Sequence, residues 1–137
     1  MTGRLGSWLH RSARRSSTNA AQHERVVRAL VAVAEQADSR GLTRMLHPGV
    51  VLTVDGGGVV AAPAAALEGA PDVGGYLRGL LLDGVVSLRV ESVNGVPGIV
   101  VSEEGRVTGV LSVCVRGRLI LEAWLVSNPE KLTRWSC

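Results

Sequence analysis

The sequence predicts one α+β domain in which N-terminal helices pack on the concave face of a curved antiparallel sheet. Apolar residues recur at helical spacing in the first half of the chain, whereas from Val86 onward they alternate as in strands. Gly- and Asn-containing turns separate these strands. Helices followed by a meander of strands are typical of α+β domains. A sheet curled over helices forms an open-ended cone, whose mouth is the expected pocket.

The length and composition fit a single folded domain. At 137 residues, with 46% hydrophobic and 20% charged residues, the chain can bury a substantial core and is not expected to be disordered. It contains no Phe and one Tyr, so Val, Leu and Ile must fill the core, which suits a sheet.

The N-terminus is a basic arm. We assign residues 1–18 to a flexible Arg-rich arm and residues 19–137 to the domain. Four arginines in the arm give +4, which leaves −1 for the rest of a chain whose formal net charge is +3. Such an arm could touch nucleic acid, but short basic tails are usually only solvated, so we do not expect nucleic-acid binding.

Three helices are predicted. Asn19 and Gln22 have the spacing of a helix cap and its capping-box partner, and Gly41 is expected to end the first helix. A short second helix should run from Leu42 to His47, ending at Pro48. The third helix should open at Pro71 and place four apolar residues on one face: Val73, Leu77, Leu80 and Leu81. Three glycines weaken it: Gly74, Gly75 and Gly79.

The strands are predicted from alternation and turn chemistry. Residues 50–55 and 59–62 should form a hairpin through the glycines at 56–58. Four further strands, near residues 86–91, 99–102, 106–116 and 119–126, should be joined by turns at Asn94-Gly95, Glu103–Gly105 and Arg116-Gly117. Neither face of the last two strands is cleanly polar. We therefore expect the helices to cover one face and a partner chain or the tail to cover the other, which predicts a homodimer through the sheet.

Several classes of site and location are not expected. Cys114 and Cys137 have no metal-ligand spacing, and we expect Cys114 to be a small buried hydrophobe. No metal or cofactor is predicted. The chain has no apolar run of ~18 residues that could span a membrane. The N-terminus lacks the uninterrupted apolar region of a signal peptide, so a cytoplasmic protein is expected.

Five stretches, taken in order, carry a resemblance to a known family: residues 24–27 (ERVV), 46–52 (LHPGVVL), 54–58 (VDGGG), 93–98 (VNGVPG) and 124–132 (WLVSNPEKL). They resemble SnoaL-like members of the nuclear-transport-factor-two-like superfamily, whose domains form a cystatin-like cone. The likeness is closest to the C-terminal domain of sigma-J-type extracytoplasmic-function sigma factors. The DNA- and polymerase-binding domains of those factors are absent here, so the chain is either a free-standing relative or the end of a longer sigma factor.

The resemblance implies a module that folds alone, dimerises through its sheet and regulates or senses. It also implies sigma-factor or RNA polymerase components as partners, whereas promoter recognition is not carried over. The segment Asn128, Pro129, Lys131 and Leu132 is a candidate partner interface. Its mechanical alternative is a terminal helical turn that Asn128 caps and Leu132 docks against the domain.

Superfamily enzymes place a carboxylate and one or two hydrogen-bonding side chains in the cone, which implies candidates here. The catalytic candidates are Glu122, Asp55 and Tyr76, and the pocket-lining candidates are Trp124, Asn94 and His47. Each also has a structural interpretation. Glu122 could face solvent or pair with an arginine of a neighbouring strand. Asp55 and Asn94 could serve turns, and His47 could end a helix. The ring of Tyr76 could be core, and Trp124 could be core or dimer interface.

The main hypothesis is a non-catalytic SnoaL-like regulatory or interaction module that could hold a small apolar ligand in its cone. The alternative is a small-molecule enzyme of the polyketide cyclase or ketosteroid isomerase kind, with a pocket carboxylate as general base. The glycines at 56–58 lack the Lys-Ser/Thr of a phosphate loop, and no hydrolase or metalloprotease signature is present.

Overall fold

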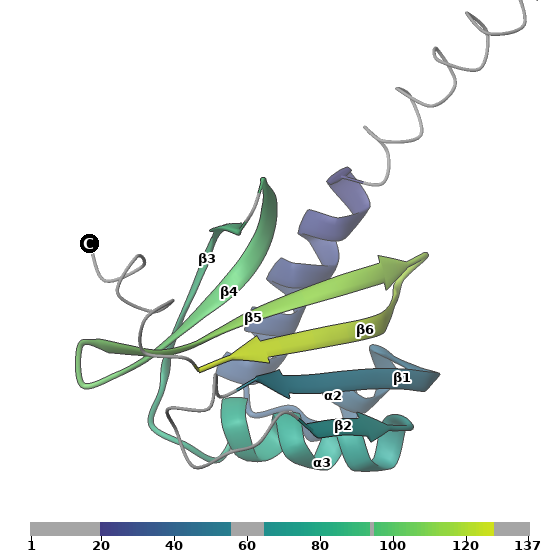
Figure 1. The fold of residues 1–137 in the computed structure, drawn as a ribbon, viewed down its shortest axis with the longest axis horizontal. Helices are drawn as coiled ribbons and strands as arrows, with labels where there is room; N and C mark the ends of the chain where they lie inside the picture. The colour runs from purple at the N-terminus through teal and green to yellow at the C-terminus, as the bar shows by residue number, and fades with distance from the viewer. Residues whose placement is uncertain (1–19, 56–64, 94, 128–137) are drawn as a thin grey trace, which may run out of the picture.

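The structure is a computed structural model that describes residues 20–55, 65–93 and 95–127 (Figure 1). The N-terminal helix occupies residues 20–35 of the described chain. The elements that follow are α2 (Ser39–Arg44), β1 (Leu46–Asp55), β2 (Ala65–Glu68), α3 (Ala70–Leu81), β3 (Ser87–Val93), β4 (Val96–Glu103), β5 (Arg106–Arg116) and β6 (Leu119–Val126). Helices therefore precede most of a curved, open sheet, which confirms the predicted α+β class. The arm at residues 1–18 lies outside the described residues.

The six strands form one sheet in the order β2-β1-β6-β5-β4-β3. The strands from β3 to β6 pair antiparallel with their neighbours in sequence, as predicted for a meander. The first and last strands of the domain, β1 and β6, pair in parallel, which the sequence did not predict. This pairing joins the two halves of the chain into one sheet.

The turns predicted between β3, β4, β5 and β6 are present, with a shift in the last, while the predicted turn at 56–58 lies outside the described residues. Val93 pairs with Val96 at the end of the β3–β4 hairpin, and Gly95, between them, has a φ of 85°. This agrees with the hairpin predicted from Asn94-Gly95, because such turns need positive φ. The last turn comes one residue later than predicted: Arg116 still pairs with Leu119, so residues 117–118 form the turn.

The predicted boundaries of the first two helices were wrong. The N-terminal helix ends at residue 35, and Gly41 lies inside α2. The cause is Asp38, whose carboxylate accepts a hydrogen bond from the Gly41 N–H at 2.9 Å and so caps α2 at Ser39. This cap starts the second helix earlier than the apolar pattern alone indicated.

The segment from His47 to Val50 is an irregular part of β1, not the end of a helix. Leu46 pairs with Ile120 and Val51 with Glu122, so the register between β1 and β6 shifts over these residues. Pro48 has no backbone N–H to donate to a neighbouring strand. It is tolerated here because backbone groups at a strand irregularity lie outside the regular hydrogen-bond ladder. The strand that pairs with β1 at its other edge is β2. The predicted strand at 59–62 lies outside the described residues.

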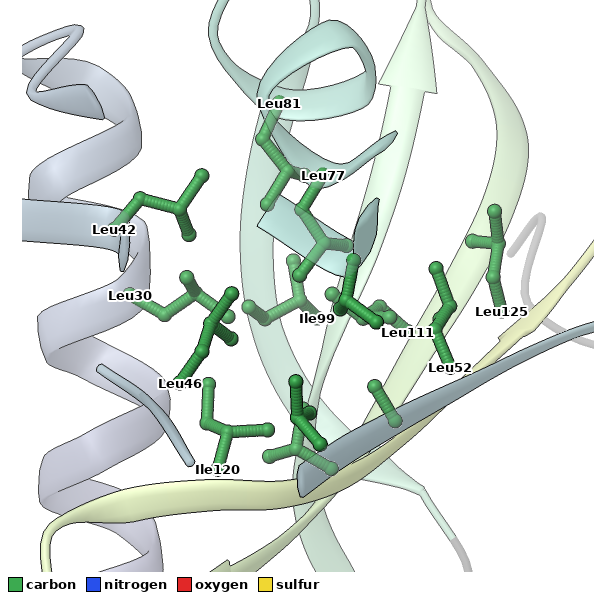
Figure 2. Packing of buried hydrophobic residues seen from close by; sticks show 14 of the residues in the cluster. Leu30, Leu42, Leu46, Leu52, Leu77, Leu81, Ile99, Leu111, Ile120 and Leu125 are labelled. Atoms are coloured by element: carbon green, nitrogen blue, oxygen red, sulfur yellow. The ribbon is translucent and has the colours of Figure 1, made fainter. Parts of the chain in front are cut away.

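The core fills the concave side of the sheet with aliphatic side chains (Figure 2). Leu30 comes from the N-terminal helix, Leu42 from α2 and Leu77 from α3, and they meet Ile99 and Leu111 of the sheet. All five have at most 1% of their surface exposed. No polar or charged side chain of the described residues is buried. The interior is therefore an aliphatic core, as the composition predicted.

Candidate functional site

The sheet has a second face, which we call the outer face, directed away from the helices. Side chains of paired residues project to the same side of a sheet. Val113 pairs with Ala123 and both belong to the core, so the neighbouring pair Cys114 and Glu122 belongs to the outer face. Across the adjacent strands β1, β6 and β5, the outer face includes Val51, Thr53 and Asp55 of β1, Leu119, Glu122, Trp124 and Val126 of β6, and Val110, Ser112, Cys114 and Arg116 of β5.

A β-bulge at Leu121 sets this arrangement. Cys114 pairs with Glu122 while Val115 pairs with Ile120, so β6 has one extra residue between these pairs. Regular alternation would place Ile120 on the same face as Glu122 and Trp124. Because the bulge adds a residue, Ile120 is fully buried in the core while Trp124 is 39% exposed on the outer face.

Apolar side chains gather on the outer face. Trp124 lies between Thr53 and Ser112 on the neighbouring strands, and Val51 and Val126 are half-buried. Val93 and Val110 are buried in a cluster of their own, with Val107 packed against them. An exposed aromatic side chain on a face that also carries several valines is typical of a protein-binding surface.

Cys114 is exposed, so the prediction that it is a buried hydrophobe was wrong. The reason is its register: as the partner of Glu122 it points to the outer face, whereas its neighbour Val113 enters the core. The sequence did not reveal this, because Cys114 alternates with Ser112 and Arg116 but also with Val110, so neither face of the strand is cleanly polar.

The structure does not bring the three catalytic candidates together. Glu122 is half-buried on the outer face, where its β1 partner Val51 lies four residues before Asp55. Asp55 ends β1, and its carbonyl accepts a hydrogen bond from the Ser127 N–H at 3.0 Å. Tyr76 is 38% exposed on α3, which packs on the opposite face of the sheet. The aliphatic core separates Tyr76 from both carboxylates.

The remaining candidates have structural surroundings or fall outside the described chain. Trp124 lies on the outer face rather than in a pocket of the cone. His47 Nδ1 accepts a hydrogen bond from the Gly49 N–H at 2.9 Å, so this imidazole supports the irregular turn in β1. Asn94 and the interface candidates Asn128, Pro129, Lys131 and Leu132 lie outside the described residues.

Among the described residues, three hollows at the rim of the helical layer stand out. One, of about 320 Å³, lies between the N-terminal helix and the β5–β6 turn and is lined by Arg25 and Arg118. The second, of about 310 Å³, lies between α2 and α3. The third, of about 360 Å³, lies near the ends of the N-terminal helix and α3. None of the three is lined by Glu122, Asp55 or Tyr76. No sequence motif marked the residues that line them.

Two further observations bear on the kind of site. Within residues 20–55, 65–93 and 95–127, no group of three or more His, Cys, Asp or Glu side chains is arranged to hold a metal ion. In the same part of the chain, no helix combines the length and the apolar character needed to cross a membrane.

No protein-family model and no curated protein sequence matches the chain. Its fold does match solved structures. The extracytoplasmic-function sigma factor SigJ of Mycobacterium tuberculosis aligns with a TM-score of 0.65 and 26% identity, over 94% of this chain and 50% of SigJ. The chain thus spans half the length of that sigma factor.

Two other solved structures share the fold at lower identity. An NTF2-like protein of unknown function from Mesorhizobium loti aligns with a TM-score of 0.61 and 17% identity, over 79% of this chain and 92% of its own. A Mycobacterium tuberculosis protein in complex with estradiol-17beta-hemisuccinate aligns with a TM-score of 0.59 and 14% identity, over 80% and 95% of the two chains. The fold and these matches agree with the motifs in the sequence: the chain has the nuclear-transport-factor-two-like fold.

Proposed function

We propose that the chain is a non-catalytic regulatory or interaction module and that the outer face of the sheet is its binding surface. The observation that carries this proposal is the exposed Trp124, which shares with Val51, Val110 and Val126 a face that the described helices do not cover. The likeness to half of SigJ supports a regulatory role beside sigma-factor domains.

The interior of the cone offers little support for catalysis. A general base in a cone must lie close to a substrate and near a donor that stabilises the developing oxyanion. Here the described interior is filled by aliphatic side chains and holds no buried polar side chain. An apolar ligand in the cone would have to displace these side chains. No observation on Glu122, Asp55 or Tyr76 favours the enzyme alternative.

A second copy of the chain is the occupant that the outer face fits best. Across β1, β5 and β6 this face carries the charged side chains of Asp55, Glu122 and Arg116, whereas the direct cross-strand partners of Trp124, Thr53 and Ser112, are uncharged. Homodimers commonly use one self-complementary patch related by a two-fold axis, and interface cores are depleted of charge. An aromatic anchor such as Trp124 is the residue type that dominates such interfaces.

The test compares two exposed aromatic residues. Trp124→Glu places a charge on the outer face, whereas Tyr76→Glu places the same charge on α3, at a residue that is equally exposed (38% against 39%). Sedimentation velocity should show a dimer for the wild type and for Tyr76→Glu, and a monomer for Trp124→Glu. Circular dichroism should show that both variants are folded.

Two results would count against this assignment. A dimer that survives Trp124→Glu would place the interface elsewhere. If the wild type is a monomer, the second copy is not the occupant, and binding of a purified sigma-factor or RNA polymerase component that depends on Trp124 would identify the partner instead.

A further inference from the structure

The hollow of about 320 Å³, which we call the Arg25–Arg118 groove, lies on the helical side and contains no residue of the outer face. Its lining residues are Gln22, Arg25, Val26, Ala29, Met45 and Arg118. Its volume lies at the lower end of the range of about 300–1,000 Å³ typical of small-molecule sites.

The fold builds both walls of the groove. Four lining residues, 22, 25, 26 and 29, follow one another at the i, i+3, i+4 and i+7 spacing of a single helical stripe. The opposite wall combines Met45, which follows α2, with Arg118 in the β5–β6 turn. These two segments are tied together, because the Ile120 N–H donates a hydrogen bond of 2.7 Å to the Met45 carbonyl.

The chemistry of the groove is divided between an apolar floor and a polar rim. Val26 is 5% exposed, and Ala29 and Met45 extend this apolar surface. The rim carries the guanidinium groups of Arg25 and Arg118. In the part of the chain that the structure describes, neither forms an ion pair, and the groove is lined by no carboxylate. Two guanidinium groups beside an apolar surface match an anionic head that carries an apolar tail.

We propose that the Arg25–Arg118 groove binds a small amphipathic carboxylate. The carboxylate accepts hydrogen bonds from the two guanidinium groups, and the apolar tail lies on Val26, Ala29 and Met45. A carboxylate fits better than a free phosphate, because the floor offers more apolar than polar surface to a ligand. The proposal goes beyond the dimer through the outer face and does not depend on it.

The experiment uses octanoate as the probe and follows backbone amide shifts in a titration of the full chain. Octanol, which has the tail without the charge, and inorganic phosphate, which has a charge without the tail, are titrated in parallel. The double variant Arg25→Gln/Arg118→Gln removes both guanidinium groups. Its matched control, Arg28→Gln/Arg116→Gln, removes two exposed arginines from the same helix and the same hairpin that do not line the groove.

We expect saturable octanoate binding that shifts amides of residues 22–29, 45 and 118. The double variant should bind at least about tenfold more weakly, while the control variant binds like the wild type. The proposal is overturned if octanol binds as tightly as octanoate, if both double variants bind alike, or if no saturable binding occurs. If no saturable binding occurs, the aliphatic parts of the Arg25 and Arg118 side chains only cover the apolar floor of the groove. Trp124→Glu should leave octanoate binding unchanged, which separates this site from the proposed interface.

Discussion

Replacing the two glycines on the open side of α3 with alanine should stabilise the domain. Gly75 and Gly79 are helical, and a Cβ atom built on either would have no heavy atom within 4 Å. Glycine costs about 1 kcal/mol relative to alanine in a helix interior, and less near an end. We expect about 1 kcal/mol from Gly75→Ala and about 0.5 kcal/mol from Gly79→Ala, which lies in the last turn. The double variant should melt about 5 °C higher.

Gly98 provides the contrast that tests this reasoning. A Cβ atom built on Gly98 would lie 2.6 Å from Val93 Cγ2 and 3.2 Å from the Leu111 carbonyl oxygen. Gly98→Ala should therefore cost about 1–3 kcal/mol through overpacking. Urea denaturation of the three single variants measures each difference. If Gly75→Ala lowers the free energy of unfolding, then α3 is not free on that side; if Gly98→Ala is neutral, Val93 does not pack over Gly98.

Four further substitutions test separate parts of the fold, each by urea denaturation. Asp38→Ala removes the side-chain cap of α2 and should cost about 1 kcal/mol, while Asp38→Asn, which can still cap, should cost much less. Leu77→Ala empties a fully buried site and should cost about 2–5 kcal/mol; a smaller loss would mean that the interior is looser than described. His23→Ala leaves the Pro97 carbonyl without its 2.8 Å hydrogen bond from the imidazole and should cost about 1–2 kcal/mol, and an unchanged midpoint would show that water replaces that bond. Arg28→Gln should change stability by less than about 0.5 kcal/mol, because its 3.8 Å ion pair joins side chains that are 62% and 52% exposed; a larger loss would contradict this view of the pair.

The sequence predicted the fold class because its strongest signals are local. The Asn94-Gly95 turn and the apolar stripe of α3 follow from backbone conformation and helical period, which neighbouring residues determine. The boundaries of the first helices could not be derived in the same way. Gly41 was expected to end the first helix, and only the packed structure shows that Asp38 caps α2 and leaves Gly41 inside it.

The candidate site was harder to predict, because it depends on which face of a strand a residue occupies. Trp124 and Glu122 were assigned to the same face, and the structure has them on the same face, but it is the outer one. Apolar residues occupy both faces of β5 and β6, so alternation could not distinguish the core side from the outer side. The Arg25–Arg118 groove combines residues distant in sequence and leaves no local pattern.

The bulge at Leu121 has a consequence for how this chain can vary in length. In a regular strand, loss of one residue exchanges the buried and exposed sides of everything beyond it. Here Leu121 is the supernumerary residue, since Val115 pairs with Ile120 and Cys114 already pairs with Glu122. Deleting Leu121 would restore an unbroken ladder with Ile120 inside and Trp124 outside. Loss of Leu121 would therefore leave Trp124 on the outer face, whereas loss of one residue from a regular strand would move the residues beyond it to the opposite face.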